Sequence, residues 1–311
     1  MQKEVLSILP PGIRKLLLSQ PEDVLKQVEE IRLGIGKKVM LYHQGRETVL
    51  SDACGEHVCS REDMAKLIQA VSNSSLYAFD AEIKQGFISI PGGHRIGLAG
   101  KAVIEAGKVK RINPIISVNI RVARQVIGAA SPLINLLTDR KTALICHTLI
   151  ISPPKCGKTT LLRDLARQIG NGLQGFPPQR VGIVDERSEL AGSFQGIPQL
   201  DVGLRTDVLD NCPKAEGMMM LIRSMGPDVM ITDEIGTEKD VAAVREAINA
   251  GVTIIASAHA GSFEELLKRP ELAKLVTDQV FKRIVLLSGR KGAGTLEMVL
   301  DSLGKIIWRE D

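Results

Sequence analysis

The stretch Ser152-Pro-Pro-Lys-Cys-Gly-Lys-Thr-Thr160 decides the fold of this chain. An apolar run over 145–151 precedes it, and a helical pattern from Leu161 to Ile169 follows it. A strand, a loop ending in Gly-Lys-Thr and a helix, in this order, are typical of a phosphate-binding loop. In such a loop, backbone N–H groups of the loop and of the helix N-terminus surround the phosphates of a nucleotide.

The side chains of this loop suit ATP and Mg²⁺. Lys158 would place its ammonium group beside the β- and γ-phosphate oxygens, and Thr159 would place its hydroxyl on Mg²⁺. The usual pattern begins with glycine, which allows a tight turn, whereas the first position here is Ser152. Because serine is small, we expect nucleotide binding to survive this difference. The candidate nucleotide-binding residues are Ser152, Pro153, Pro154, Lys155, Cys156, Gly157, Lys158, Thr159 and Thr160.

Strand and helix patterns alternate through the second part of the chain. Strands are predicted over five ranges, with helices after most of them: 145–151, 180–185, 228–233, 252–258 and 281–287. Such alternation is typical of an α/β fold, in which helices cover a parallel-rich sheet. The last stretch, 295–308, indicates strands that close the edge of this sheet.

The first part of the chain is predicted to form a smaller α+β domain. Its expected elements are helical pieces within 1–20 and 22–28, a strand at 38–42, a helix at 60–72, a hairpin over 86–99 and a strand at 118–122. Ser60 can cap the helix that it begins, with Asp63 in the third position. A helix start at Ser131-Pro132 lies near the change of pattern, so we expect the domains to span 1–135 and 136–311.

Two of the predicted strands end in acidic residues, which are Asp233 with Glu234 and Asp185 followed by Glu186 and Glu189. The carboxyl ends of parallel strands face the ligand crevice. Asp185 and Asp233 are therefore the candidate Mg²⁺ ligands beside Thr159. Glu186, Glu189 and Glu234 are candidates for orienting or activating the attacking water, and the sequence does not decide between them. The alternative is that these acids are ordinary solvent-exposed ends of strands.

One histidine and several arginines are further candidates for catalysis. His259 ends the strand that begins at Thr253, where a polar side chain could sense the γ-phosphate. Arg95, Arg121 and Arg124 of the first domain could stabilise charge on a transferring phosphoryl group. The alternatives are an ordinary hydrogen-bonded histidine and arginines in ion pairs.

The composition narrows the classes of partner. With 40 basic and 36 acidic side chains, the net charge of +4 is too small to indicate a nucleic acid, and aromatic residues at 3% are too few for a base-stacking platform. Neither a signal peptide nor a membrane-spanning stretch is recognised. Cys156 lies inside the loop, which favours a reducing cytoplasm. Cys54, His57 and Cys59 are potential metal ligands without a fourth, so reduced thiols are the better interpretation.

Taken together, the motifs closely resemble the type II/type IV secretion ATPase family, and in particular its members that act in endospore formation. The matching segments cover nearly the whole chain. Besides the phosphate loop they are 91–100, 117–124, 183–189, 203–207, 225–236 and 257–260.

The resemblance implies a RecA-like core behind an N-terminal domain, assembled as a homo-oligomer, a hexameric ring. It places Asp185, Glu186 and Glu189 in the family's aspartate box. It likewise places Asp233 and Glu234 in the Walker B box, and His259 in the histidine box. Arg121 and Arg124 would complete the site, in some members from the neighbouring subunit.

The resemblance also implies where such an ATP hydrolase would act. It would be cytoplasmic and peripheral to the membrane through its partners, which would be membrane proteins of a channel complex between mother cell and forespore. Three functions remain open. The first is a Mg²⁺-dependent ATPase that energises or assembles this channel. The second, suggested by Ser152, is a nucleotide-binding scaffold with little or no turnover. The third is a RecA-like nucleic-acid motor, against which the charge and the scarce aromatics count.

Overall fold

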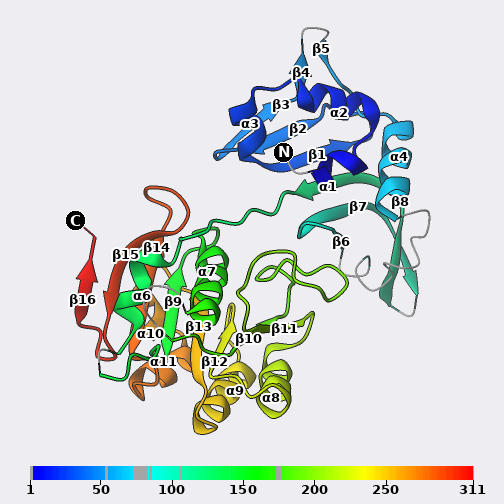
Figure 1. Ribbon diagram of the computed structural model, residues 1–311. Helices are drawn as coiled ribbons and strands as arrows, with labels where there is room; N and C mark the ends of the chain where they lie inside the picture. The colour runs from blue at the N-terminus through cyan, green and yellow to red at the C-terminus, as the bar shows by residue number, and fades with distance from the viewer. Residues whose placement is uncertain are drawn as a thin grey trace. The chain divides into compact units, whose positions relative to one another are not determined.

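The structure is a computed structural model that describes residues 3–52, 55–72, 83, 86–105, 107–139, 141–172 and 177–310. It divides into two compact units, Met1–Arg124 and Gln125–Asp311 (Figure 1). This boundary lies earlier than the position after residue 135 that the sequence suggested. The reason is that Ala130, Leu133 and Ile134 pack into the hydrophobic core of the second unit.

A six-stranded antiparallel sheet forms the centre of the first unit, in the order β3-β2-β1-β8-β7-β6. Its strands are β1 (Val28–Gly34), β2 (Met40–His43), β3 (Arg46–Val49), β6 (Phe87–Ile90), β7 (His94–Glu105) and β8 (Lys108–Arg121). The other elements with described bounds are a short strand pair and four helices: β4 (Ser51–Asp52), β5 (Gly55–Glu56), α1 (Lys3–Ile8), α2 (Pro11–Leu18), α3 (Glu22–Gln27) and α4 (Arg61–Ser72).

Buried apolar and exposed polar side chains alternate along the strands, which gives this sheet one apolar face. Ile31 and Leu33 are buried, whereas Arg32 between them is exposed. Apolar side chains of α1, α2 and α4 join the strands in one core. Helix α4 is capped as predicted, because the Ser60 hydroxyl accepts the Asp63 N–H at 3.0 Å and the Asp63 carboxylate accepts the Ser60 N–H at 2.9 Å.

His94 is a fully buried histidine in this unit. Its Nδ1 accepts the backbone N–H of Ala123 at 2.9 Å, and burial lowers its pKa to about 4. A histidine in the unfolded chain titrates near 6.5, so the unfolded state binds more protons between pH 6.5 and 4. The stability that neutral His94 contributes is therefore present above pH 6.5. It is lost as the pH falls, by up to roughly 3 kcal/mol near pH 4.

Denaturant unfolding of the first unit, followed at pH 7 and at pH 4.5, should show this loss. His94→Gln keeps a hydrogen-bond acceptor but cannot take up the proton, so the variant should lose less stability between the two pH values. An equal loss in both proteins would contradict the assignment to His94.

An eight-stranded sheet forms the centre of the second unit, in the order β11-β10-β12-β13-β9-β14-β15-β16. The first six strands of this order run parallel, and the last two are antiparallel. The strands are β9 (Thr148–Ser152), β10 (Val181–Asp185), β11 (Thr206–Asp210), β12 (Val229–Thr232), β13 (Thr253–His259), β14 (Arg283–Ser288), β15 (Thr295–Leu300) and β16 (Ile306–Arg309).

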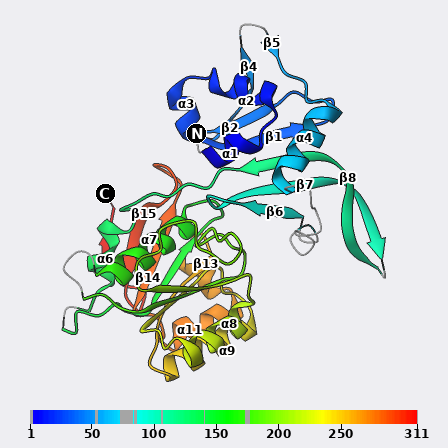
Figure 2. The ribbon, with the colours of Figure 1, turned by 45° about the vertical axis from the view of Figure 1, so that its right-hand side comes forward.

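Helices cover both faces of this sheet. Leu149 and Ile150, neighbours in β9, belong to opposite hydrophobic cores. One core contains α6 (Ser131–Leu137) and α7 (Lys158–Asn171), and the other contains α8 (Lys214–Ser224), α9 (Glu238–Asn249), α10 (Phe263–Leu267) and α11 (Pro270–Thr277). Figure 2 shows α6 and α7 apart from α8, α9 and α11. The predicted α/β fold with a parallel-rich sheet is confirmed.

The cysteine-rich segment of the first unit is only partly described. Cys54 lies outside the described residues, His57 Nε2 lies 3.0 Å from the Asp63 carboxylate, and Cys59 is fully buried. Within the described ranges, no three His, Cys, Asp or Glu side chains are grouped to hold a metal ion. Among the described helices, none combines the length and the apolar character needed to cross a bilayer.

Candidate nucleotide-binding site

The predicted phosphate loop connects β9 to α7 in the second unit. Ser152 still belongs to β9 and pairs with His259 of β13, so its backbone is extended and does not require glycine. Gly157 at the other end of the loop has a φ of 84°. A Cβ there would lie 2.6 Å from the backbone nitrogen of Gly294, so only glycine fits. These positions explain why serine is tolerated at the start of the loop and glycine is needed at its end.

Lys158 is buried against this loop and is 6% exposed. Its Nζ donates to the carbonyl oxygen of Ser152 at 3.1 Å, to the Ser152 hydroxyl at 3.0 Å and to the carbonyl oxygen of Pro153 at 3.0 Å. Burial lowers the pKa of this ammonium group. An ammonium group held among oxygen acceptors at the N-terminus of a long helix is arranged to receive phosphate oxygens.

A line of polar contacts leads from Lys158 across the ends of the strands. Lys158 Nζ lies 3.1 Å from Nδ1 of His259, and His259 Nε2 lies 2.8 Å from the Glu234 carboxylate. A charged lysine can only donate and has three protons for these four contacts, so it shares a proton between Nδ1 and one of the oxygen acceptors. Nδ1 then accepts, and Nε2 carries the proton that is donated to Glu234. The other oxygen of Glu234 lies 3.3 Å from the guanidinium group of Arg187. The line therefore joins the loop to two of the predicted catalytic residues.

Glu234 is held in an uncommon backbone conformation. Its φ is 44°, which few residues other than glycine adopt, and its N–H donates to the Ser257 hydroxyl at 3.0 Å. Such conformations persist where the surroundings hold them and are concentrated at functional sites. In this site, the backbone conformation of Glu234 directs its carboxylate toward His259.

Asp185 at the end of β10 organises the loop that follows it. Its fully buried carboxylate accepts the backbone N–H groups of Glu189 and Ala191, both at 2.9 Å. Burial raises its pKa. Arg163 of α7 holds the same loop by donating to the carbonyl oxygens of Leu190 at 2.5 Å and Glu189 at 2.7 Å. The two oxygens of Asp185 are thus engaged by backbone amides, a role that the sequence did not suggest.

Asp233, which follows β12, differs from Asp185 because its carboxylate is not fully engaged by hydrogen bonds from the described residues. It is 3% exposed, and its buried Oδ1 has no hydrogen-bond partner within the part of the chain that the structure describes. Burial, together with the nearby charge of Asp185, raises its pKa to about 7. An unsatisfied carboxylate oxygen suits a hard cation, and Thr159, the second residue of α7, offers a half-buried hydroxyl. The donor chemistry therefore fits Mg²⁺ at Asp233 and Thr159.

Asp233→Asn should stabilise the protein in the absence of nucleotide and metal. The folded state holds the proton of Asp233 more tightly than the unfolded state, so its stability falls as the pH rises from 3.8 through about 7. The full difference between the folded and unfolded pKa values of Asp233 corresponds to roughly 4 kcal/mol of stability. The unfolding midpoint of Asp233→Asn should therefore exceed that of the wild type clearly at pH 8 and less at pH 5. A gain that does not change with pH would show that ionised Asp233 carries no such cost.

The remaining predicted acids differ in their surroundings. Glu186 forms an ion pair with Lys214, whose side chain is 10% exposed. Glu189 accepts a hydrogen bond from Arg163 with its backbone carbonyl oxygen. A cavity of about 510 Å³ is lined by Glu186, Lys214, Glu234, His259 and Arg269, among others. The structure thus gathers Glu186, Glu234 and His259 around one space.

Sequence reasoning missed several residues of this site. Arg187 stands inside the quoted acidic segment and contacts Glu234, so the segment itself carried the signal. Lys214 begins α8 after β11, a strand that was not predicted, so no pattern pointed to it. Gly294 donates its N–H to the carbonyl oxygen of Cys156 at 2.9 Å from a loop distant in sequence.

The predicted arginines belong to the first unit. Arg121 Nε lies 3.5 Å from the Glu30 carboxylate, and the guanidinium group of Arg95 lies 3.8 Å from the centre of the Phe87 ring. Burial lowers the pKa of Arg124. Their contribution to a nucleotide site stays a prediction.

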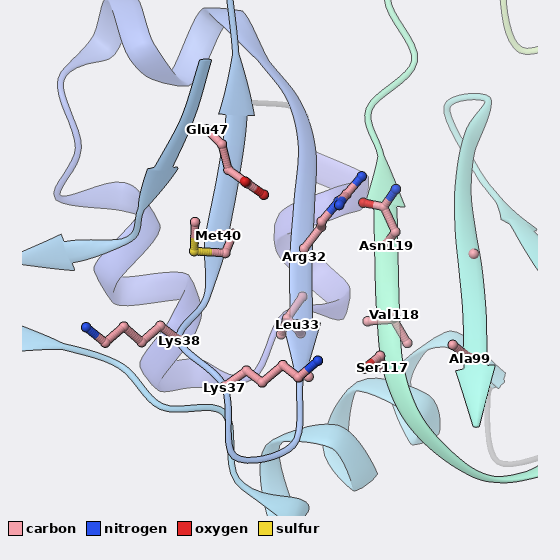
Figure 3. A pocket seen from close by; sticks show the side chains of 12 residues that line it. Arg32, Leu33, Lys37, Lys38, Met40, Glu47, Ala99, Ser117, Val118 and Asn119 are labelled. Atoms are coloured by element: carbon pink, nitrogen blue, oxygen red, sulfur yellow. The ribbon is translucent and has the colours of Figure 1, made fainter. Parts of the chain in front are cut away.

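The first unit has a cavity of its own, of about 610 Å³, on its sheet (Figure 3). Arg32 and Lys38 line it, and Figure 3 shows their charged ends pointing to opposite sides. Each is paired with a glutamate, Arg32 with Glu30 at 3.1 Å and Lys38 with Glu56 at 2.5 Å. Both of these cations are therefore already paired with carboxylates, and the phosphate-loop motif lies in the second unit, which holds the candidate site.

Comparison with known proteins agrees with this arrangement. The family model described as "Sporulation stage III, protein AA" matches residues 1–307. The chain is 45% identical to stage III sporulation protein AA of Bacillus subtilis (strain 168), covering 98% of this chain and 97% of that protein. This confirms the resemblance drawn from the motifs.

Solved structures of secretion and pilus ATPases share the fold. The pilus retraction motor PilT with bound ADP matches with a TM-score of 0.57 at 13% identity, covering 92% of this chain and 78% of that one. The Legionella pneumophila ATPase DotB matches with a TM-score of 0.52 at 14% identity, covering 89% of this chain and 75% of that one. The expected RecA-like core of the secretion ATPases is thereby confirmed as a fold.

Proposed function

Because the chain belongs to the sporulation stage III, protein AA family, we propose that it is a Mg²⁺-dependent ATPase that energises or assembles a channel between mother cell and forespore. The observation that carries the proposal is the line of contacts from Lys158 through His259 to Glu234. It brings together a phosphate-loop lysine and a strand-end carboxylate, two of the parts that hydrolysis of a γ-phosphate uses.

Each residue then has a distinct task. The loop 152–160 binds the phosphates of ATP, and Lys158 leaves its carbonyl contacts for the β- and γ-phosphate oxygens. Asp233 and Thr159 hold Mg²⁺, which neutralises charge on the phosphates when bound. Asp185, proposed from sequence as a third ligand, positions the loop 186–191 through its amide contacts.

Glu234 orients the attacking water, and His259 links its carboxylate to the charge state of Lys158. Glu186 and Glu189 support Glu234 in orienting this water, and Glu186 is held in place by its ion pair with Lys214. Arg121 and Arg124 complete the site by stabilising charge on the transferring phosphoryl group. The same proposal includes assembly as a hexameric ring that is peripheral to the membrane and bound to membrane proteins of the sporulation channel.

A nucleotide-binding scaffold is the second candidate. Lys158 is retracted onto Ser152 and Pro153, so ATP must displace these contacts before it is bound. Binding could then organise the ring while turnover stays slow.

One experiment separates the two candidates. Titration with ATP and Mg²⁺ measures binding, and phosphate release by the assembled protein measures turnover. Saturable binding with steady release supports the ATPase, whereas saturable binding without release, also in the presence of the membrane partners, supports the scaffold. If well-folded protein shows no saturable binding, both proposals fail.

A further inference from the structure

The outer part of the β7–β8 hairpin extends beyond the sheet of the first unit. Strand β6 pairs with β7 only as far as Gly97, and β1 pairs with β8 no further out than Ser117. Within the described ranges, residues 100–116 therefore form a ladder of two strands, joined to the rest of the sheet at its base, where the carbonyl oxygen of Ile116 accepts the N–H of Ile35 at 2.9 Å. Figure 1 and Figure 2 both show this ladder as a ribbon that projects away from the other strands. We refer to residues 100–116 as the outer hairpin.

The direction of the outer hairpin is fixed by its backbone. The pairing register shifts on both sides of Gly100. A Cβ on Gly100 would lie 2.1 Å from the carbonyl oxygen of Pro114, so the two strands approach more closely than any other residue permits. Bulges of this kind bend a strand and change where its side chains point. The projection is therefore a built feature of the fold.

The outer hairpin combines exposed aliphatic side chains with basic ones. Ile104 and Val109 lie opposite each other and are 66% and 40% exposed. The segment holds four basic residues and one acidic residue, a formal charge of +3, whereas the whole chain carries +4. Its acid, Glu105, is already paired with Lys110 at 2.5 Å. Three of its basic side chains, Lys101, Lys110 and Arg111, are exposed on the same two strands as Ile104 and Val109.

We propose that the outer hairpin contacts an anionic lipid bilayer. Ile104 and Val109 enter the interfacial region, while Lys101, Lys110 and Arg111 reach the phosphate groups of the lipids with their flexible side chains. Basic side chains near an anionic leaflet add attraction that depends on salt.

Two features favour a lipid surface over a protein partner. The segment 100–116 contains no Trp, Tyr or Phe, the residues that dominate the centres of protein interfaces. Its charged groups are nearly all of one sign, which suits a uniformly anionic surface. The inference goes beyond the proposed function, because it does not depend on nucleotide.

Vesicle flotation of the full chain tests this contact. Vesicles of phosphatidylcholine with phosphatidylglycerol should capture the protein, and vesicles of phosphatidylcholine alone should not. A variant with Lys101→Gln, Lys110→Gln and Arg111→Gln should bind roughly a hundredfold more weakly, since each basic side chain near such a surface contributes roughly fivefold. A variant with Ile104→Ser and Val109→Ser should lose roughly tenfold.

The matched control neutralises three other exposed basic residues of the first unit, Lys15, Lys26 and Lys66, by the same change to glutamine. It should bind vesicles as the wild type does, and all variants should bind ATP equally. The proposal would be overturned if the wild type did not bind anionic vesicles. It would also be overturned if both hairpin variants bound these vesicles as tightly as the wild type. A change in oligomer size in the hairpin variants with vesicle binding intact would overturn it as well, and would identify a contact between copies of the chain.

Discussion

Lys158→Ala should remove saturable ATP binding and lower phosphate release by at least about a hundredfold. The side chain supplies the ammonium group that now donates to Ser152 and Pro153 and would donate to phosphate oxygens. It also holds Nδ1 of His259, so its loss disturbs the link to Glu234 as well. Titration with a fluorescent ATP analogue and a phosphate-release assay measure the two effects.

The control for this substitution lies in the same loop. Lys155 is exposed and has a φ of 60°, a conformation that asparagine tolerates, so Lys155→Asn removes a lysine without straining the loop. Its activity should stay within about twofold of the wild type if Lys155 contributes to the loop through its backbone N–H, which the substitution keeps, and its side chain adds only surface charge. Because Lys158 is buried, its removal leaves acceptors unpaired and costs about 1–3 kcal/mol, so folding must be checked by thermal unfolding. Wild-type hydrolysis by folded Lys158→Ala would remove the phosphate loop from the mechanism.

The fold of the second unit could be predicted well because its signals are local. Buried parallel strands are continuous apolar runs, and β9, β10, β12, β13 and β14 overlap the five predicted ranges. The missed strand, β11, is only half-buried and carries Asp207 and Asp210, so its composition resembles a loop. Strand β1 was missed for a similar reason: Glu29, Glu30 and Arg32 interrupt its apolar residues. Edge position and partial burial are properties of the assembled sheet, which a short sequence window does not contain.

The candidate site was predictable as a list of residues and not as a set of contacts. Strand ends follow from the fold, so the order of the strands brings His259 beside Ser152. The hydrogen bonds do not follow from it. Asp185 and Asp233 look equivalent in sequence, yet backbone amides engage Asp185, while Asp233 keeps an oxygen without a partner among the described residues. The difference depends on how the chain turns after each strand.

Glu234→Gln should keep ATP binding and lower turnover by roughly 10²- to 10³-fold. Glutamine has the same shape and can still accept a hydrogen bond from His259, but it carries no charge to orient or deprotonate water. The backbone of residue 234, with its bond to Ser257, is unchanged by the substitution. Single-turnover phosphate release at saturating ATP measures the chemical step directly, and a binding titration confirms that the nucleotide site is intact.

The competing assignment is tested by Glu186→Gln in the same assay. Glu186 is neutralised by its contact with Lys214, whereas Glu234 is connected through His259 to the lysine that faces the phosphates. A carboxylate tied to the phosphate-binding lysine can respond to the arrival of ATP, and one tied to Lys214 cannot do so by this route. Glu234→Gln should therefore lose far more turnover than Glu186→Gln. The reverse order would assign water activation to the end of β10 and leave His259 as a structural link between β9 and β12.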